Sequence, residues 1–418
     1  MSKPVVIVGA GLSGLTCARV LTEAGHAVRI FEKDDAVGGR VQTDEVDGFR
    51  LDRGFQILLT GYPELRRHLD LDALDLRPFD PGAVLWTGAG FETIGDPLRK
   101  PSTLLPTVFA RSGNVLDKLR VLTLRRDALR GGNYDAFDSA DGTTAALLRA
   151  WGFSDRFIKR FFTPFLGGIF LEPELETTAR FFRFVWRMFA TGKATVPARG
   201  MGEIPKQLAA GLPGDAVTTG CAVTEVRPDG VRLDDGTAVH AASVVVAGAA
   251  PAARDLVPSV PAIGERGVTC LYFATETAPT NKPVLHLDGT GTGPVNNLHV
   301  ASAVSSAVAP GDRTLISATC LGLHDDLEAL EARARDQLRG WFGDGVNRWT
   351  ALRHYPIRHA LPAQPVGALE PSRRPVRHDS GVYLCGDYLD QASIDGAMVS
   401  GRRAAEAVLA DRSARATA

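Results

Sequence analysis

Three glycines near the amino terminus have a spacing that lets the backbone approach a phosphate group closely. The run Gly9-Ala10-Gly11-Leu12-Ser13-Gly14 follows an apolar segment, 4–8, and precedes a helix-like pattern over 12–24. In such a turn the first glycine permits the bend, the second admits a pyrophosphate, and the third lets helix pack on strand. The free N–H groups and positive dipole end of the helix then attract the anion. The predicted contacts are Gly9, Gly11, Leu12, Ser13 and Gly14.

A carboxylate follows the glycine run at a sequence spacing that is typical of a residue that binds a ribose. Glu32 ends the second apolar segment, 28–32, and lies 18 residues after Gly14. Its oxygens can accept hydrogen bonds from an adenosine ribose and would repel a 2′-phosphate. We expect Glu32 and the neighbouring Lys33 at the nucleotide. This βαβ pattern predicts a dinucleotide site but does not separate NAD from FAD.

A second glycine pair favours the longer of these two molecules. Gly38 and Gly39 allow another close approach to a diphosphate, and Arg40 can neutralise the diphosphate or touch a flavin edge. An NAD site does not need this extra grip. The alternative is a surface turn with a solvated arginine.

The carboxyl-terminal region repeats the strand, turn and helix pattern. An apolar segment, 381–384, leads to Gly386-Asp387, and a last helix is expected from about residue 396 to 409. Asp387 can bind ribityl hydroxyls, and the helix amino terminus can stabilise the negative charge of a reduced flavin. The alternative is a turn that serves packing only. The predicted contacts here are Gly386, Asp387, Ser393, Gly396 and Ala397.

Together these segments resemble the flavin amine oxidase superfamily, which includes phytoene desaturases, protoporphyrinogen oxidases and monoamine oxidases. The stretch 386–401 looks closest to the desaturase branch, and the turn 197–202 is similar to one found there, with Arg199 replacing a glycine. The resemblance implies an α/β fold, with a Rossmann-like FAD-binding domain of the GR2 type and an inserted α+β substrate domain. It also implies that Val223 meets the adenine through its backbone.

Departures from the monoamine oxidases bear on the chemistry. The resemblance places Thr269 where those enzymes carry a lysine, and Ser393 where they carry a tyrosine. The sequence has no cysteine between Cys320 and Cys385, where members with a covalent flavin carry one. The resemblance therefore implies non-covalent FAD and speaks against simple amine oxidation.

The order of the segments predicts a discontinuous cofactor domain with two inserts. The FAD-binding domain is expected to comprise residues 1–79, 200–261 and 356–418. The substrate domain is expected to comprise 80–199, mainly helical, and 262–355, a mixed sheet with an amphipathic helix over 327–342.

Two segments of the first insert are candidates for the substrate side. Residues 153–189 hold ten of the 19 phenylalanines, and they predict either an aromatic core or the wall of a cavity for a large apolar molecule. Residues 99–132 hold eight Lys and Arg against two Asp. They predict an exposed helical face or a surface that docks on an anionic membrane.

For the reaction, we expect hydride transfer from a fairly large apolar substrate to flavin N5, which forms a C=C or C=X bond. O2 or a quinone would then accept the electrons. An amine oxidase with an atypical site and a non-redox FAD-dependent isomerase are the alternatives. Candidate proton carriers are Tyr388, Gln391, Asp395, Tyr355 and His359.

Bulk composition narrows the remaining possibilities. The formal net charge of −1 gives no global argument for nucleic-acid binding. Five widely spaced cysteines indicate reduced thiols rather than a disulfide framework or a zinc site, and thus a cytoplasmic protein. We expect no metal and no transmembrane helix, since no apolar stretch reaches about 18 residues. The oligomeric state stays open.

Overall fold

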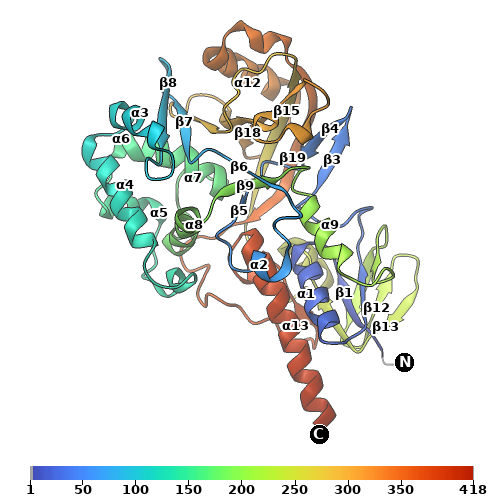
Figure 1. Ribbon diagram of the computed structural model, residues 1–418. Coiled ribbons are helices and arrows are strands. Elements are labelled where there is room, and N and C mark those ends of the chain that lie inside the picture. Colours follow the sequence, from blue (N-terminus) through green and yellow to red (C-terminus); the bar gives the residue numbers. More distant parts are fainter. Residues whose placement is uncertain (1–2, 418) are drawn as a thin grey trace.

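A five-stranded parallel sheet forms the base of the computed structural model, which describes residues 3–417 and their side chains as far as residue 414 (Figure 1). The strand order is β10-β2-β1-β14-β20, and every neighbouring pair is parallel. The central strands are runs of valine and isoleucine that are buried on both faces, as expected of a parallel sheet covered by helices. The strands are β1 (Val5–Val8), β2 (Val28–Phe31), β10 (Val217–Thr218), β14 (Ser243–Val246) and β20 (Tyr383–Leu384).

The first and last helices pack against each other beside this sheet (Figure 1). They are α1 (Leu12–Glu23) and α13 (Ile394–Thr417). Gly401 permits the close approach, because a Cβ at this position would overlap the carbonyl oxygen of Ser13. Helix α13 begins two residues before the expected start at 396 and continues past the expected end at 409, so residues 410–417 are helical as well. Ala418 lies outside the described residues.

Smaller elements complete the lobe that contains the parallel sheet. An antiparallel sheet is formed by β11, β12 and β13, while β3 pairs with β4. The bounds are β3 (Thr43–Val46), β4 (Phe49–Asp52), α2 (Leu65–His68), α9 (Glu203–Ala210), β11 (Val223–Arg227), β12 (Gly230–Leu233), β13 (Ala238–His240) and α10 (Ala250–Leu256).

A seven-stranded sheet dominates the second lobe, in the order β19-β15-β18-β17-β16-β7-β8. Helix α12 (Leu327–Phe342), whose bounds agree with those expected, buries Leu330, Ala334 and Leu338 in one core cluster with residues of this sheet. The strands are β7 (Gly82–Trp86), β8 (Phe91–Gly95), β15 (Glu265–Thr275), β16 (Leu285–Asp288), β17 (Val295–Val300), β18 (Thr314–Leu321) and β19 (Thr350–Pro362), and α11 (Ala301–Val304) follows β17.

This sheet differs from the expected division of the chain in two respects. Residues 80–199 were expected to be mainly helical, yet β7 and β8 lie in this segment and extend the sheet, with β7 pairing in parallel with β16. The continuous apolar run of residues 82–86, buried in its middle three residues, is the local cause. The expected boundary at 355/356 falls inside β19, which pairs with β15 on both sides of this point and so belongs to the seven-stranded sheet.

The remaining part of the first insert is a helical lobe, which includes a π-helical turn over Ile158–Phe162 (Figure 1). A three-stranded sheet of order β5-β9-β6 connects it to the rest of the molecule. No helix among residues 3–417 combines the length and apolar character needed to cross a bilayer. The bounds are β5 (Leu58–Leu59), β6 (Leu76–Pro78), α3 (Leu104–Phe109), α4 (Val115–Ala128), α5 (Thr144–Ala150), α6 (Asp155–Phe157), α7 (Thr163–Phe170), α8 (Ala179–Thr191) and β9 (Ala194–Pro197).

Candidate active site

The carboxyl ends of the parallel strands open into one large cavity. Val8, Phe31, Val246 and Gly386 each stand at or just after the end of a different strand, and all four line this cavity. Ligands of open α/β sheets bind at this edge, because the loops and helix amino termini meet there. The parallel topology therefore brings together the motifs predicted near residues 9, 32 and 386.

The glycine turn has the two properties that a phosphate site requires. A Cβ placed on Gly11 would meet nothing within 4 Å, so the main chain there faces open cavity. Gly14 instead serves packing, because a Cβ there would overlap the carbonyl oxygen of Gly9. Leu12 and Ser13 line the cavity in the first turn of α1, where N–H groups have no acceptor inside the helix. The turn thus forms an anion cradle.

Glu32 is held rigidly at the end of β2. One carboxylate oxygen accepts from the amide of Ala10 at 2.6 Å, and the other accepts from the amide of Asp34 at 3.0 Å. Each oxygen keeps a further lone pair, and the side chain lines the cavity. This arrangement suits acceptance of hydrogen bonds from two vicinal hydroxyls.

Arg40 and Asp387 form a bridge across the floor of the cavity. The Arg40 guanidinium donates to Asp387 Oδ1 at 2.7 Å and to the carbonyl oxygen of Ala360 at 3.2 Å. Glu265 contributes a further negative charge nearby, and burial raises the pKa of its carboxyl to about 7 although Arg40 opposes the shift. Arg40 therefore already neutralises an anionic neighbour, and its backbone lies in the glycine turn that reaches the cradle.

The amino-terminal end of α13, from the carboxyl-terminal region of the chain, forms another wall of the cradle. Ser393 Oγ accepts from the amide of Gly396 at 3.0 Å and so caps this end of the helix. Ile394 and Ala397 line the cavity, so the positive end of the helix dipole faces it. Gly396 itself is needed for packing, because a Cβ there would overlap the carbonyl oxygen of Gln391.

Most predicted cofactor contacts come together around this cavity. Gly14 and Gly396 act one layer behind its wall, for the packing reasons given above. The predicted contacts that line it are Gly9, Gly11, Leu12, Ser13, Glu32, Lys33, Gly38, Gly39, Arg40, Val223, Gly386, Asp387, Ser393 and Ala397.

The side-chain amide of Gln56 has a buried oxygen that lacks a hydrogen-bond donor within the described part of the chain. Gln56 Nε2 donates to the carbonyl oxygen of Arg40 at 2.8 Å, which fixes the side chain. Gln56 Oε1 is buried, lines the cavity wall, and has no hydrogen-bond partner among the residues that the structure describes. A buried acceptor without a donor is costly, so a bound molecule with an N–H or O–H group would satisfy it. The glycine cradle, Glu32 and Gln56 thus fit a flavin dinucleotide.

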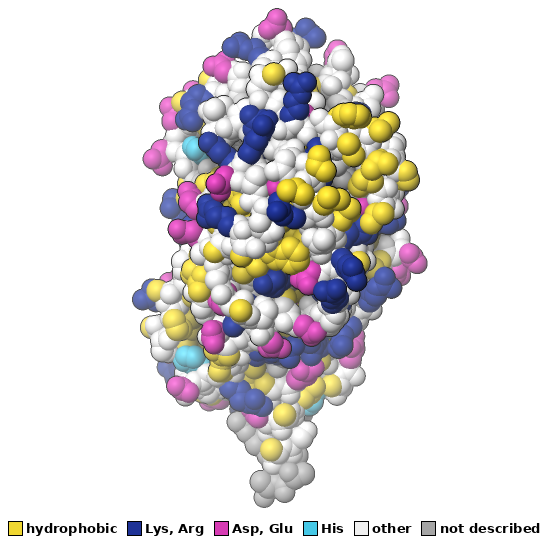
Figure 2. All heavy atoms as spheres, turned by 90° about the vertical axis from the view of Figure 1, so that its left-hand side faces the viewer, with side chains coloured by type: hydrophobic (Ala, Val, Ile, Leu, Met, Phe, Trp, Pro, Cys, Tyr) yellow, Lys and Arg dark blue, Asp and Glu magenta, His cyan; other side chains and the backbone are white. Residues whose placement is uncertain are grey.

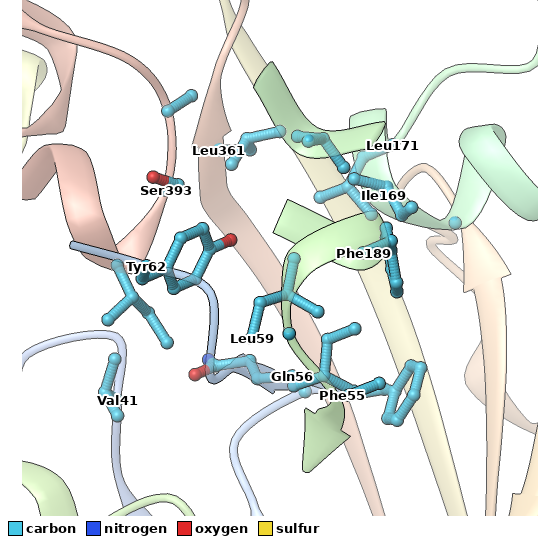
Figure 3. A pocket seen from close by; sticks show the side chains of 18 of the residues that line it. Val41, Phe55, Gln56, Leu59, Tyr62, Ile169, Leu171, Phe189, Leu361 and Ser393 are labelled. Atoms are coloured by element: carbon cyan, nitrogen blue, oxygen red, sulfur yellow. The ribbon is translucent and has the colours of Figure 1, made fainter. Parts of the chain in front are cut away.

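The cavity continues from the cradle into an apolar chamber, and its volume is about 2220 Å³. Figure 3 shows Tyr62 and Ser393 on one side of the chamber, facing Ile169, Leu171 and Phe189 on the other. Some phenylalanines of the aromatic segment 153–189 form core and others form cavity wall, while the large apolar molecule that the wall was expected to hold stays a prediction. Phe153, Phe162, Phe170, Phe182 and Phe184 are buried away from the chamber, and Phe157, Phe161, Phe165, Phe181 and Phe189 line it.

Residues 12–409 match the family model described as flavin containing amine oxidoreductase. The chain belongs to this family. It is therefore a flavin-containing oxidoreductase, and the predicted resemblance is confirmed at the level of the superfamily. Among solved structures, a putative protoporphyrinogen oxidase from Exiguobacterium sp. 255-15 has the same fold, with a TM-score of 0.73 and 18% identity over 98% of this chain and 99% of that one. This likeness confirms the Rossmann-like α/β fold.

Sequence similarity to individual family members is local. A phytoene desaturase from Fusarium fujikuroi is 33% identical over 96 residues, which are 22% of this chain and 17% of the desaturase. An L-amino-acid oxidase from Sistrurus catenatus edwardsii is 42% identical over 77 residues, which are 18% of this chain and 15% of the oxidase. These matches cover less than a fifth of each relative, so they leave the substrate of this family member open.

None of the three predicted catalytic side chains lines the cavity. Tyr388 follows Asp387 but turns into the core, where its hydroxyl is buried. Gln391 is fully buried and donates to Asp395 at 3.0 Å. The Tyr355 hydroxyl donates to Asp44 at 2.7 Å, and the side chain is not among those that line the cavity. In this arrangement none of the three side chains reaches the cavity surface, and their role as proton carriers stays a prediction.

His359 and Tyr62 are among the other titratable side chains that line the cavity. His359, also a predicted candidate, lines it from β19, and Tyr62 lines it from the turn after β5. Burial raises the pKa of Tyr62 well above its usual value, and Asp395 adds to the shift, so its hydroxyl stays protonated. Tyr62 was missed, because it belongs to no motif and its place depends on distant pairing.

Strand β15 carries the position at which the resemblance places the lysine of the monoamine oxidases. The residue of this strand that lines the cavity is aliphatic. Thr269 donates to the carbonyl oxygen of Gly322 at 3.0 Å and faces away from the chamber, whereas Val268 lines the cavity. Ser393, the other predicted departure, does line it. The described residues also contain no group of three His, Cys, Asp or Glu placed to hold a metal ion.

Proposed function

We propose that this family member binds FAD non-covalently and oxidises a large apolar molecule at a C–H bond, which leaves a C=C or C=X bond in the product. The observation that carries the proposal is the continuity of the cavity. One space of about 2220 Å³ joins the dinucleotide cradle to a chamber of aromatic and aliphatic side chains. Such a volume exceeds that of typical small-molecule pockets, about 300–1000 Å³, and leaves room for a substrate beside the dinucleotide.

When bound, FAD supplies the two-electron oxidation by accepting a hydride at flavin N5, and O2 or a quinone takes the electrons afterwards. The protein's own residues set the geometry. Ile169, Leu171 and Phe189 exclude water from the chamber and hold apolar surface by burial. The carbonyl and amide groups of the cradle hold the polar cofactor at the opposite end.

Tyr62 and His359 are the groups that we propose to handle protons or polar substrate atoms. Because its pKa is raised, Tyr62 acts as a hydrogen-bond donor at neutral pH and not as a base. In such an oxidation the substrate loses a hydride from one atom and a proton from the neighbouring atom, and the electron pair that the proton leaves behind forms the double bond. His359 can accept this proton. The balance is one hydride to the cofactor and one proton to the histidine or to solvent.

The decisive experiment is anaerobic bleaching of the flavin band by candidate substrates, namely polyenes, porphyrinogens, alcohols and amines. We expect bleaching by a large apolar compound, and recovery of the band when O2 or a quinone is admitted. Bleaching by amines with release of ammonia would replace the proposal by amine oxidation. Turnover only with pre-reduced flavin and no net oxidation would replace it by isomerisation.

A blocked chamber ties this activity to the cavity. Ile169→Trp fills space in the chamber, whereas Val366→Trp adds the same ring at an exposed position that is 49% accessible. We expect the first variant to keep its flavin spectrum and to lose bleaching by about tenfold or more. Equal activity of both variants would show that the substrate does not use the chamber.

A further inference from the structure

Helix α3 exposes apolar side chains that a globular protein normally buries. All six residues, 104–109, lack burial, although four of them are Leu, Val or Phe. Leu105 is 66% exposed and Phe109 is 76% exposed. The adjacent helix α4 adds Val115, which is 67% exposed, and three leucines. We call these side chains the apolar collar: Leu104, Leu105, Val108, Phe109, Val115, Leu116, Leu119 and Leu122.

The orientation of α4 is fixed by specific polar contacts. The helix buries Asp117 and Leu124, while its apolar face points outward. Asp117 and Asn114 form a capping box, and Asp117 also accepts from the amide of Ser154 at 2.8 Å. Lys118 Nζ donates to the carbonyl oxygens of Val108 and Ala110, which links α3 to α4. These contacts fix the rotation of α4 about its axis, so the apolar side chains on its outward face stay exposed to solvent.

The collar is continuous with the wall of the chamber. Leu104, Val108, Val115, Leu119 and Leu122 each belong both to the collar and to the cavity lining. Apolar side chains thus extend from the exposed collar into the lining of the cavity. Figure 2 views the side of the molecule that carries α3 and α4, and hydrophobic side chains gather there beside Lys and Arg.

Basic side chains lie in the same segment as the collar. Residues 99–132 hold eight Lys and Arg against two Asp, and four of the eight basic side chains pair with carboxylates: Arg99 and Arg125 with Asp96, Lys100 with Asp80, and Arg130 with Asp127. Arg111 and Arg126 are exposed, and within the described part of the chain neither has a recorded ion pair. A contiguous apolar patch with a basic rim is the surface that an anionic bilayer attracts, through apolar insertion and through charge.

We propose that the apolar collar docks onto an anionic lipid bilayer and opens the chamber to the acyl-chain region. The inference rests on the proposed function for the apolar nature of the substrate. A bilayer is favoured over a protein occupant because any protein seated on the collar would close the entrance. Acyl chains would instead extend the apolar phase up to the chamber, so a lipid-soluble substrate could enter without crossing water.

The test is flotation of the purified full-length protein with vesicles of phosphatidylcholine alone or with phosphatidylglycerol added. Leu105→Ser/Phe109→Ser removes two collar side chains that do not line the cavity. Leu323→Ser/Val366→Ser is the matched control, because both residues are exposed outside the collar. Arg111→Glu/Arg126→Glu reverses the rim charge. Flavin absorbance and circular dichroism establish that each variant is folded.

We expect wild type and control to float with the anionic vesicles, and both test variants to lose binding by about tenfold or more. Wild type that stays unbound to either vesicle, or binding that survives loss of the collar side chains, overturns the proposal. Size-exclusion elution that reveals a dimer, dissociated by the Ser double variant, assigns the collar to a second copy and also overturns it. Failure of the flavin chemistry leaves these binding results readable, so the two proposals fail separately.

Discussion

Arg40 donates a hydrogen bond to Asp387 over 2.7 Å, although 347 residues separate them in the chain. This ion pair joins the glycine turn that follows β2 to the turn that follows β20. The side chain of Asp387 is 6% exposed, so removal of its partner leaves a buried charge uncompensated.

Arg40→Met should therefore weaken both the fold and flavin binding. We expect a loss of about 2–3 kcal/mol in the free energy of unfolding and at least about tenfold weaker flavin affinity. Urea denaturation and titration of the apoprotein with FAD measure the two effects. Arg232→Met, which breaks an exposed ion pair with Glu225, is the control and should change neither quantity. Unaltered FAD affinity in Arg40→Met would contradict the assigned role.

Two glycines of one motif should respond differently to the same substitution. Gly11→Ala adds a methyl group that meets nothing in the protein, so the apoprotein's melting temperature should stay unchanged while flavin affinity falls by about tenfold or more. Gly14→Ala forces a methyl group against the Gly9 carbonyl and should lower the melting temperature by several degrees. Gly214→Ala, also open to solvent, is the control. Retained affinity in Gly11→Ala would remove the phosphate from this turn.

Acid should destabilise the protein through a buried histidine. Burial lowers the pKa of His299 to about 3, and His286 adds to this effect. Since the unfolded state binds a proton near pH 6.5 and the folded state does not, stability is lost as the pH falls from about 6.5 toward 3.

His299→Phe should remove part of this acid sensitivity. The centroid of the His299 ring lies 4.4 Å from the centroid of the Phe55 ring, so a phenyl ring suits the site. The quantity to compare is the free energy of unfolding of the variant minus that of wild type at each pH. This difference should be about 2 kcal/mol more favourable to the variant at pH 5 than at pH 8. Thermal unfolding at the two pH values gives the difference, and His240→Asn at the surface is the control. Parallel pH curves for wild type and His299→Phe would contradict the prediction.

Denaturation should release the flavin intact. Four cysteines are buried in the core, and Cys221 is partly exposed; among the described residues, the cavity lining includes no cysteine. We expect all yellow colour in the supernatant after acid precipitation, with the mass of the protein unmodified. Colour that stays with the pellet would show a covalent link, for which His359 and Tyr62 are the lining side chains to test first.

The cradle could be predicted from the sequence because its parts are local. The spacing of Gly9, Gly11 and Gly14 dictates a turn between strand and helix, and Glu32 ends the next strand. The parallel sheet then brings these turns to one edge. Local pattern and global topology agree here, so residue type and spacing were sufficient.

The catalytic side of the cavity depends on contacts that no local pattern encodes. Tyr62 reaches the chamber because β5 pairs with β9, where Leu58 opposes Thr195. Tyr388 was expected at the flavin because it follows Asp387, but the 3-10 turn over Asp387–Leu389 directs its ring into the core. Such directions follow from tertiary packing, which spacing alone does not show.

The wide sequence separation of the cradle's parts has a consequence for folding. Arg40 and Asp387 meet although they lie 347 positions apart in the chain. Contacts of such wide separation form slowly, because the entropy of closing a long loop must first be overcome. During refolding, the ability to retain the coenzyme should therefore appear in a late phase, after the local turns and helices have formed.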